Sequence, residues 1–493
     1  MKKTMARLLA CILVLSILLP ALISCAGKPA EQSASEAPNA ISDEATDAAT
    51  TEEVLKADVP DVDMNGKKFT FLTSGWGEEV WIMNDIVAEE ENGDPVNDAK
   101  YRRNRAIEER FNCEIADYNT MANDPVPTLK KTVLADDKSY DFFEARLHQY
   151  LPLARDGLIL NLYDIPHMDL TKPWWDQNSV KSLSVANKLY AVTSDITIMD
   201  NDATSAFVFN KGMITDYGLD SPYQAVKDGT WTLDALEKLV KTVSKDVDGN
   251  GTMDENDMYG LLYQRDTMTA FLAGGGEFIA RKDANDLPYI SLNEQKSVDI
   301  VSNLLRVLYD KTTCMNVMIP FPTDFNPWMS SMFASDRALF MWIRMVNVVA
   351  LRAMETDFGI LPIPKYNAEQ GNYYSAVNPW TGACITVPAS NTDLENSGIF
   401  LEAFAAESRY TLQPAYYDIL LNGKVVRDQD SKEMLDIIFD NRVYDIGDIG
   451  RFGDLHMIIY MTMDYDSNVV SYIEKRLTKA NRDIEKLIDG INQ

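Results

Sequence analysis

The sequence predicts an α/β fold from its element order and its composition. A strand-like run at 67–72 precedes a helix-like stretch at 98–111, and a second strand-like run follows at 112–115. This order is typical of a βαβ unit with parallel strands. The chain has 493 residues, of which 46% are hydrophobic and 25% are charged. Such a composition indicates a globular protein with room for two or three domains.

The elements can be read in order along the chain. The first strand is apolar at Phe69, Phe71 and Leu72, and a glycine-containing loop with Trp76 follows it. Apolar residues recur at helical spacing over 231–243, with Thr232 as the expected N-cap. Further runs typical of strands lie at 141–145, 189–192, 207–210, 258–263, 358–361 and 384–387, and a mostly helical region extends from 396 to 492.

The N-terminus has the pattern of a bacterial lipoprotein signal peptide. Three basic residues precede an apolar run over 8–19, which is too short to span a bilayer as a mature helix. A small residue then stands directly before Cys25, so we expect lipid attachment at Cys25 and removal of residues 1–24. The alternative is an ordinary signal peptide that a cysteine follows by chance.

Residues 25–57 differ in composition from the rest of the chain. They are rich in Ala, Ser, Thr, Glu and Asp and contain no aromatic residue. Such a segment buries too little apolar surface to become ordered, so we expect a disordered acidic tether. Because no later stretch approaches about 18 apolar residues, the membrane contact is expected through the lipid alone, on the extracellular face of a bacterial, Gram-positive cell.

Charge and composition exclude several function classes. The chain has 46 Lys and Arg against 75 Asp and Glu, a net charge of −29, which argues against a nucleic-acid partner. Three histidines argue against multi-histidine metal chemistry. The cysteines beyond the leader (Cys113, Cys314 and Cys384) have no paired zinc-site spacing, so we expect buried free thiols.

No catalytic signature occurs in the sequence. It contains no nucleophile-elbow motif, no zinc-protease helix motif and no Walker A loop. We therefore expect a protein that is not an enzyme. A glycosidase carboxylate pair stays open as an alternative, because the acidic residues offer many such pairs.

Residues 246–257 match the pattern of an EF-hand calcium loop. Gly251 stands where this loop makes its sharp turn, and Asp257 replaces the usual final glutamate. A strand-like run follows the loop where a second helix would complete the hand, so we expect a structural Ca²⁺ site. The alternative is an acidic turn without metal. The predicted ligands are Asp246, Asp248, Asn250, Thr252 through its carbonyl, Asp254 and Asp257.

Several of the eight tryptophans lie in loop-like sequences beside proline, glycine or asparagine. A sugar ring presents an apolar C–H face that packs on an aromatic ring, while its hydroxyls need polar side chains nearby. We expect at least two tryptophans of this set to face a ligand, and core packing is the alternative for each one. The set comprises Trp76, Trp174, Trp175, Trp328 and Trp380.

Taken together, the segments resemble the bacterial extracellular solute-binding proteins of family 1, the sugar-binding lipoprotein receptors of ABC importers. The resemblance spans about residues 69–445, in the order of that family. The segments that carry it are 93–99, 187–192, 207–211, 229–233, the acidic loop with 259–261, 272–277, 337–340 and 357–362.

The resemblance implies a two-lobe periplasmic-binding-protein-like fold. Each lobe would be a mostly parallel sheet flanked by helices, with crossings near 192–198 and 376–385 and a hinge between the lobes. The N-terminal lobe would hold 58–195 and about 385–420. The C-terminal lobe would hold about 196–384 and 421–493.

The resemblance also implies an interlobe cleft that closes on a ligand and then docks on membrane permease subunits, with the receptor a monomer. A carbohydrate, most simply an oligosaccharide, is the expected ligand. If Arg146, Arg265 and Arg344 converge in the cleft, they indicate an anionic ligand such as a uronic acid. The alternatives are a non-sugar solute or a surface glycosidase. The candidate ligand-binding residues are Trp76, Glu144, Arg146, Trp175, Gln264, Arg265, Asp266, Trp342, Arg344 and Trp380.

Overall fold

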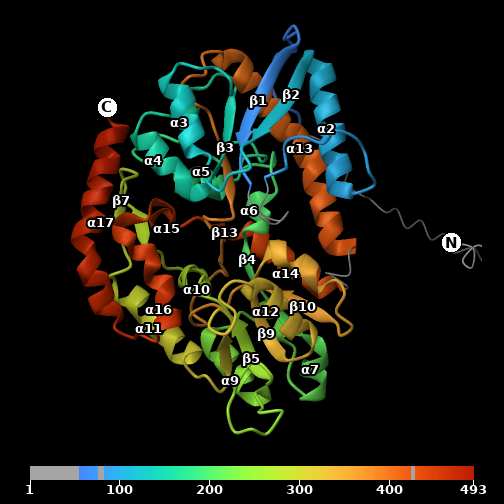
Figure 1. Cartoon of the computed structure of the whole chain (residues 1–493), viewed down its shortest axis with the longest axis vertical. Coiled ribbons are helices and arrows are strands. Elements are labelled where there is room, and N and C mark those ends of the chain that lie inside the picture. The colour runs from blue at the N-terminus through green and yellow to red at the C-terminus, as the bar shows by residue number, and fades with distance from the viewer. Residues whose placement is uncertain (1–54, 76–82, 423–427) are drawn as a thin grey trace, which may run out of the picture. The chain divides into compact units, whose positions relative to one another are not determined.

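The computed structural model describes residues 55–75, 83–422 and 428–493, which contain two larger sheets (Figure 1). The first sheet has the order β12-β3-β1-β2. In it β1 pairs in parallel with β2 and β3, while β12 runs antiparallel to β3. Its strands are β1 (Lys67–Thr73), β2 (Cys113–Asn119), β3 (Phe142–Arg146) and β12 (Ala383–Thr386).

The second sheet has the order β10-β4-β9-β5-β8. Here β5 runs parallel to β8 and β9, whereas β4 is antiparallel to both β9 and β10. Both sheets are therefore mixed. The first is mostly parallel, as expected, whereas the second has as many antiparallel as parallel pairings. The strands are β4 (Ser205–Asn210), β5 (Tyr259–Tyr263), β8 (Cys314–Asn316), β9 (Ala338–Arg344) and β10 (Phe358–Leu361).

The antiparallel strands β4 and β12 occupy equivalent places in the path of the chain. Each is the first strand after the chain passes from one sheet to the other, in the segments 193–204 and 377–382. A backbone bridge between Val192 and Ile385 and another between Thr204 and Val377 hold these two passages side by side. The predicted crossings thus lie where the chain changes sheets, although 189–192 forms one isolated bridge, at Val192, and not a strand.

Helices cover the first sheet because their apolar faces pack on its buried strands. α2 (Pro95–Phe111) begins at Asp94, whose side chain caps the helix by accepting from the Asn97 backbone N–H. It packs against the long helix α13 (Leu394–Asn422), beside which it lies in Figure 1. The other helices of this part are α3 (Val126–Leu134), η2 (Leu147–Gln149), α4 (Tyr150–Arg155), η3 (Leu162–Asp164), α5 (Gln177–Leu183) and α6 (Met199–Asp202).

The second sheet is covered in the same way. α9 (Leu233–Val243) packs on β5, and Thr232 caps it as predicted, accepting a hydrogen bond from the Ala235 N–H. α12 (Phe325–Ala334) packs on β9, and α14 (Gln429–Asp440) packs on β10. The remaining helices here are α7 (Lys211–Asp216), α8 (Pro222–Lys227), α10 (Thr267–Gly274), α11 (Gln295–Leu308) and η4 (Met345–Leu351).

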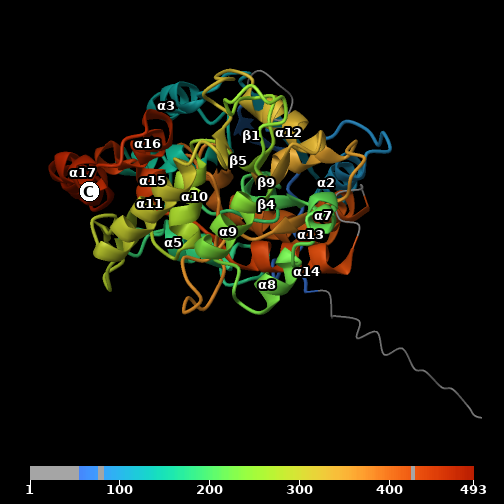
Figure 2. The ribbon, with the colours of Figure 1, turned by 90° about the horizontal axis from the view of Figure 1, so that it is seen from below.

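The C-terminal region is helical, as the sequence predicts. Its elements are α15 (Ile446–Gly450), η5 (Phe452–Tyr460), α16 (Met461–Asp464) and α17 (Val469–Ile491). α17 packs on α4 and η5, and Figure 2 shows α15, α16 and α17 on the opposite side from α7 and α14. Two short ribbons complete the fold, β6 (Ala280–Lys282) with β7 (Pro288–Ile290), and β11 (Ser375–Ala376) with β13 (Arg442–Val443).

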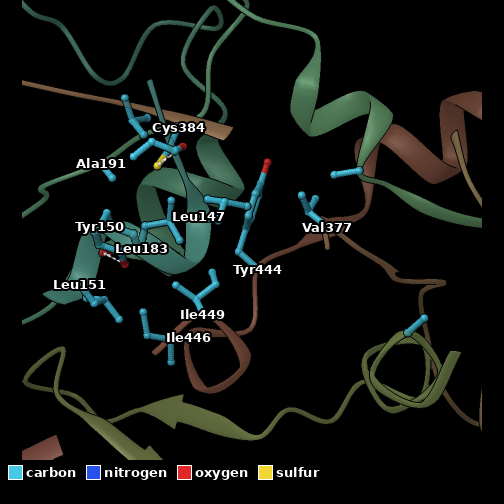
Figure 3. Close-up of a cluster of buried hydrophobic side chains, with 14 of the residues drawn as sticks. Leu147, Tyr150, Leu151, Leu183, Ala191, Val377, Cys384, Tyr444, Ile446 and Ile449 are labelled. Carbon is cyan, nitrogen blue, oxygen red and sulfur yellow. Dashed lines mark hydrogen bonds between the residues drawn. The ribbon is translucent and has the colours of Figure 1, made fainter. Parts of the chain in front are cut away.

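Buried side chains from distant segments meet beside the passages between the sheets (Figure 3). Leu147 and Tyr150 follow β3, Val377 belongs to the second passage, Cys384 to β12, and Ile449 to α15. All are at most 3% exposed. The C-terminal region is therefore packed against the segment that follows β3.

Several expectations lie outside the described residues. These are the signal peptide, Cys25, the tether up to residue 54, and Trp76. Residues 55–57, the end of the predicted tether, belong to the folded unit, where Ala57 is buried and the Leu55 N–H donates to the Tyr410 hydroxyl. That unit includes all residues from 55 to 493, so the exact lobe boundaries stay a prediction.

Candidate functional site

A cavity of about 350 Å³ lies where strands of both sheets end. Arg146 is the last residue of β3 and Arg344 is the last residue of β9, while Arg265 and Asp266 lie two and three residues after the end of β5. Because β5 and β9 are parallel, their carboxyl ends meet at one edge, which is where ligands bind in α/β sheets. The lining residues are Asn123, Arg146, Arg265, Asp266, Phe325, Asn326, Arg344, Trp380 and Thr381.

A larger groove of about 640 Å³ lies between η5 and α17. Its lining includes Tyr460, Asp464 and Arg476, and none of the sequence-predicted site residues. The smaller cavity, in contrast, contains five of them. We therefore take the smaller cavity as the candidate site.

The second passage between the sheets forms one wall of the cavity. The Nη1 of Arg146 donates to the carbonyl oxygens of Trp380 and Thr381, at 2.9 and 3.2 Å. The Nη1 of Arg344 donates to Oγ1 of Thr381 at 2.8 Å. One arginine from each sheet thus holds the same short segment, which couples the two sheets through the wall of the site.

Gly382 makes this close approach possible. A Cβ atom at this position would lie 2.8 Å from Cδ1 of Leu147 and 3.0 Å from Cγ1 of Val377. Real Cβ contacts are longer than this, so any side chain at 382 would push the wall away from β3.

The acidic and amide groups of the wall orient the third arginine. Arg265 is 33% exposed, its Nε lies 3.4 Å from Oδ1 of Asp266, and its Nη1 donates to the Tyr460 hydroxyl at 3.1 Å. Nδ2 of Asn378 donates to the other carboxylate oxygen of Asp266 at 3.3 Å. Asp266 is therefore shared between the loop after β5 and the passage that carries Trp380.

Burial lowers the pKa of both Arg146 and Arg344. In each case a different neighbouring carboxyl group acts against this lowering. The Glu144 carboxyl raises the pKa of Arg146, and Asp266 raises that of Arg344. Arg344 lowers the pKa of Arg146 further, because two positive charges repel. Guanidinium groups ionise with a pKa so high that both stay charged at neutral pH. The cavity lining thus carries three cations and one carboxylate.

Glu144 and Gln264 lie next to this lining in the chain, and both are buried. Neither carboxylate oxygen of Glu144 and neither amide atom of Gln264 has a hydrogen-bond partner within the described residues. Burial raises the pKa of Glu144 well above its usual range, with Asp85 as the next cause. The structure thus favours a neutral carboxylic acid at Glu144.

Trp380 and Phe325 are the aromatic side chains that line the cavity among the described residues, and Trp380 is 47% exposed. The Arg451 Cζ lies 3.9 Å from its ring centroid, and the His148 ring centroid lies 4.4 Å away. Burial and the nearby Arg451 charge lower the pKa of His148 to about 3, so this imidazole is neutral at physiological pH. The Trp380 ring is therefore held in place by neighbours while about half of it remains accessible.

Two other predicted tryptophans, Trp342 and Trp175, lie outside the cavity lining. Trp342 is 1% exposed on β9, on the same face as Arg344, and is not part of the cavity lining. Trp175 is fully buried, and its indole N–H donates to Oε2 of Glu402 at 2.9 Å. Trp175 does not line the cavity, because an acidic side chain of α13 holds it in the core.

Four lining residues were not predicted from the sequence. Thr381 follows Trp380 directly, so the polar neighbours of that tryptophan were the available signal. Phe325 and Asn326 begin α12, in a segment that reads as an aromatic loop. Asn123 lies after β2 and has no distinguishing signal.

The acidic loop at 246–257 folds as a turn between α9 and β5. Carboxylate oxygens of Asp246, Asp248 and Asp257 lie within 4.8 Å of one another. Asp257 is fully buried, and its two oxygens accept from the backbone N–H groups of Val247 and Asp254, at 2.8 and 2.9 Å. Hard oxygen donors of this kind fit Ca²⁺.

No protein-family model matches the sequence, and no curated protein does either. Solved structures do match. A cyclo/maltodextrin-binding protein solved with maltotetraose shares 13% identity at a TM-score of 0.56, over 87% of this chain and 99% of that one. The chain has the fold of a two-lobe solute-binding protein.

Two further solved structures support this fold. An ABC substrate-binding protein from Listeria monocytogenes, in complex with cycloalternan, shares 11% identity at a TM-score of 0.51, over 87% of this chain and 98% of that one. The GacH receptor of Streptomyces glaucescens, studied unliganded and with acarbose, shares 14% identity at a TM-score of 0.51, over 86% and 97%. The predicted α/β two-lobe architecture is thereby confirmed.

Proposed function

We propose that the chain is the substrate-binding receptor of an ABC importer and captures a carbohydrate between its two sheets. The observation that carries this proposal is the cavity at the strand ends, where Trp380 is half exposed beside guanidinium, carboxylate and amide groups. An aromatic face with flanking polar groups suits a sugar ring, which has an apolar face and a rim of hydroxyls.

Capture by hinge closure follows from the way the site is built. Arg146 belongs to the first sheet and Arg344 to the second, and both contact the passage at 380–381. A ligand that touches both sheets interacts better with the closed form than with the open form, so it shifts the equilibrium toward closure. The closed form would then dock on permease subunits.

The solved neighbours support a sugar ligand. The proteins named above were solved with maltotetraose, cycloalternan and acarbose. The fold itself does not fix the ligand, because one fold hosts many functions. The test is therefore binding by the purified full-length chain.

A thermal-shift screen against mono- and oligosaccharides provides that test. We expect at least one oligosaccharide to raise the unfolding midpoint, because a ligand that binds only the folded state stabilises it by mass action. The same sugar should be recovered intact. Release of reducing ends would contradict the receptor and favour a glycosidase, and stabilisation by peptides or nucleosides alone would favour a non-sugar solute.

We propose that Cys25 carries the lipid that holds the receptor at the extracellular face of the membrane. Within the described residues, no helix combines the length and apolar character needed to cross a bilayer. Metabolic labelling with a fatty-acid probe should mark the wild-type chain and leave Cys25→Ser unmarked. Labelling of both would contradict the proposal.

We also propose that the loop at 246–257 binds a structural Ca²⁺. Its ligands would be the Asp246, Asp248 and Asp257 carboxylates, joined by Asn250, Asp254 and the Thr252 carbonyl. Ca²⁺ should raise the unfolding midpoint of the wild-type chain, and EDTA should lower it. Asp248→Asn should abolish this response, whereas an unchanged midpoint in the wild-type chain would contradict the site.

A further inference from the structure

The cavity is cationic in a chain that is strongly anionic. Acidic residues outnumber basic residues by 75 to 46 in the sequence, yet the lining holds three arginines and one aspartate. The three guanidinium groups come from three separate strand ends, at the last residues of β3 and β9 and just after β5. Their convergence therefore reflects the fold of the site and not a basic stretch of sequence.

Among the described residues, two titratable groups beside the lining add no further charge to it. Burial favours the neutral form of Glu144, whose pKa is raised well above its usual range. Burial, with Arg451 as the next cause, lowers the pKa of His456 to about 4, so this imidazole adds no charge at neutral pH. Arg451, whose Cζ lies 3.9 Å from the ring centroid of Trp380, lies at the edge of the site, and its neighbour Asp448 raises its pKa while burial lowers it.

Converging cations have an electrostatic cost that an anion relieves. Arg146 and Arg344 are at most 5% exposed, and like charges repel more strongly in a poorly solvated site than in water. Arginine has five donors and no acceptor, and its planar fork matches a carboxylate with two hydrogen bonds. A ligand in this cavity must therefore supply acceptors, and a carboxylate supplies the strongest.

We infer that the ligand is an acidic carbohydrate, an oligosaccharide with a uronic-acid residue whose carboxylate lies among Arg146, Arg265 and Arg344. Trp380 then contacts the apolar face of a sugar ring, and Asp266 and Asn326 contact hydroxyls. This inference rests on the proposed function, because it assumes that a carbohydrate occupies the cavity. The volume of about 350 Å³ is at the small end for ligand sites, which suits one end of a sugar chain.

The first test compares acidic sugars with their neutral counterparts. Tetragalacturonate, oligomannuronate and a hyaluronan tetrasaccharide are titrated calorimetrically into the full-length chain, each beside the same sugar with its carboxyl groups reduced to hydroxymethyl. We expect at least one acid to bind about 10-fold or more tightly than its reduced form. This preference should shrink as salt is added, because salt screens charges.

The outcomes separate the inference from the proposed function. Neutral sugars that bind as tightly as the acids, or binding by neutral sugars alone, would overturn the inference and leave the receptor standing. Stabilisation by peptides or nucleosides with no sugar bound would overturn both. Free galacturonate is included as a further probe, and tighter binding of this monomer than of every oligomer would overturn the oligosaccharide part.

Arg265→Gln is the decisive variant because Arg265 is the most exposed of the three arginines that line the cavity. We expect it to weaken the acidic sugar about 10- to 100-fold and the reduced sugar less than about 3-fold. Arg265→Lys should restore part of the loss. Arg102→Gln is the matched control, since the Arg102 side chain is 65% exposed on α2, away from the cavity lining. Equal losses for both sugars in Arg265→Gln would overturn the inference.

Discussion

Two short segments of this chain look alike in sequence and differ in the folded protein. Residues 173–176 and 378–381 both place tryptophan directly after proline, beside polar residues. In the first segment Trp174 and Trp175 are fully buried, and both indole N–H groups donate to Glu402. In the second, Trp380 is half exposed at the wall of the cavity.

The difference shows that residues far away in the sequence decide whether a tryptophan side chain is buried or exposed to solvent. Glu402 lies on α13, 227 residues after Trp175 in the chain. It also accepts from the Asp169 backbone N–H at 3.1 Å, so three donors converge on one carboxyl. Trp380 has no such partner in the described residues, and its indole ring contacts His148 and Arg451.

The largest expected effect is on the buried segment. Glu402→Ala leaves two indole N–H groups and one backbone N–H without their acceptor, so the free energy of unfolding should fall by about 2–5 kcal/mol. Urea denaturation measures this change. Glu395→Ala is the matched control on the same helix, since the Glu395 side chain is 71% exposed, and it should change stability by less than about 0.5 kcal/mol. Similar losses in both variants would break the comparison.

The next effect concerns the exposed segment and affects binding more than stability. Trp380→Ala should weaken the sugar found in the screen about 10-fold or more, because the ring supplies apolar contact. Its free energy of unfolding should change by less than about 1 kcal/mol, since the ring is already half solvated. Trp175→Phe should show the reverse pattern, with affinity unchanged. Calorimetric titration and urea denaturation of both variants distinguish these patterns.

A smaller effect is a pH dependence carried by Glu402. Burial raises its pKa to about 7 from an ordinary 4.5, so the folded state binds the proton more tightly than the unfolded state. The stability from this group is present below about pH 4.5 and is lost as pH rises through 7, by at most about 1.4 kcal/mol per pH unit. Glu402→Gln should flatten this part of the curve. Parallel curves for the two proteins would contradict the raised pKa.

The smallest expected effect is spectroscopic. A ligand in the cavity should change the emission of Trp380, and Trp380→Phe should remove most of that change. Trp175→Phe should preserve it, because the Glu402 carboxyl and the core fix the environment of Trp175 in both states. Loss of the signal in Trp175→Phe would show that the buried segment senses the ligand.

The strand ends of the candidate site could be predicted because strands are local features. Arg146, Arg265, Asp266 and Arg344 each follow a strand-like run, and α/β folds bring such ends to one edge. The antiparallel direction of β4 could not be predicted in this way. It depends on how the chain enters the second sheet after leaving the first.

By itself, the sequence determined the α/β element order, the cap at Thr232 and the acidic loop, because spacing and nearest neighbours control them. Tertiary structure alone decided which tryptophans are buried, and it brought three arginines together around one cavity. Burial and charge convergence depend on partners hundreds of residues apart, such as Glu402 for Trp175 and Thr381 for Arg146. Local spacing carries no record of such partners, and this is why only the fold distinguishes the two tryptophan segments.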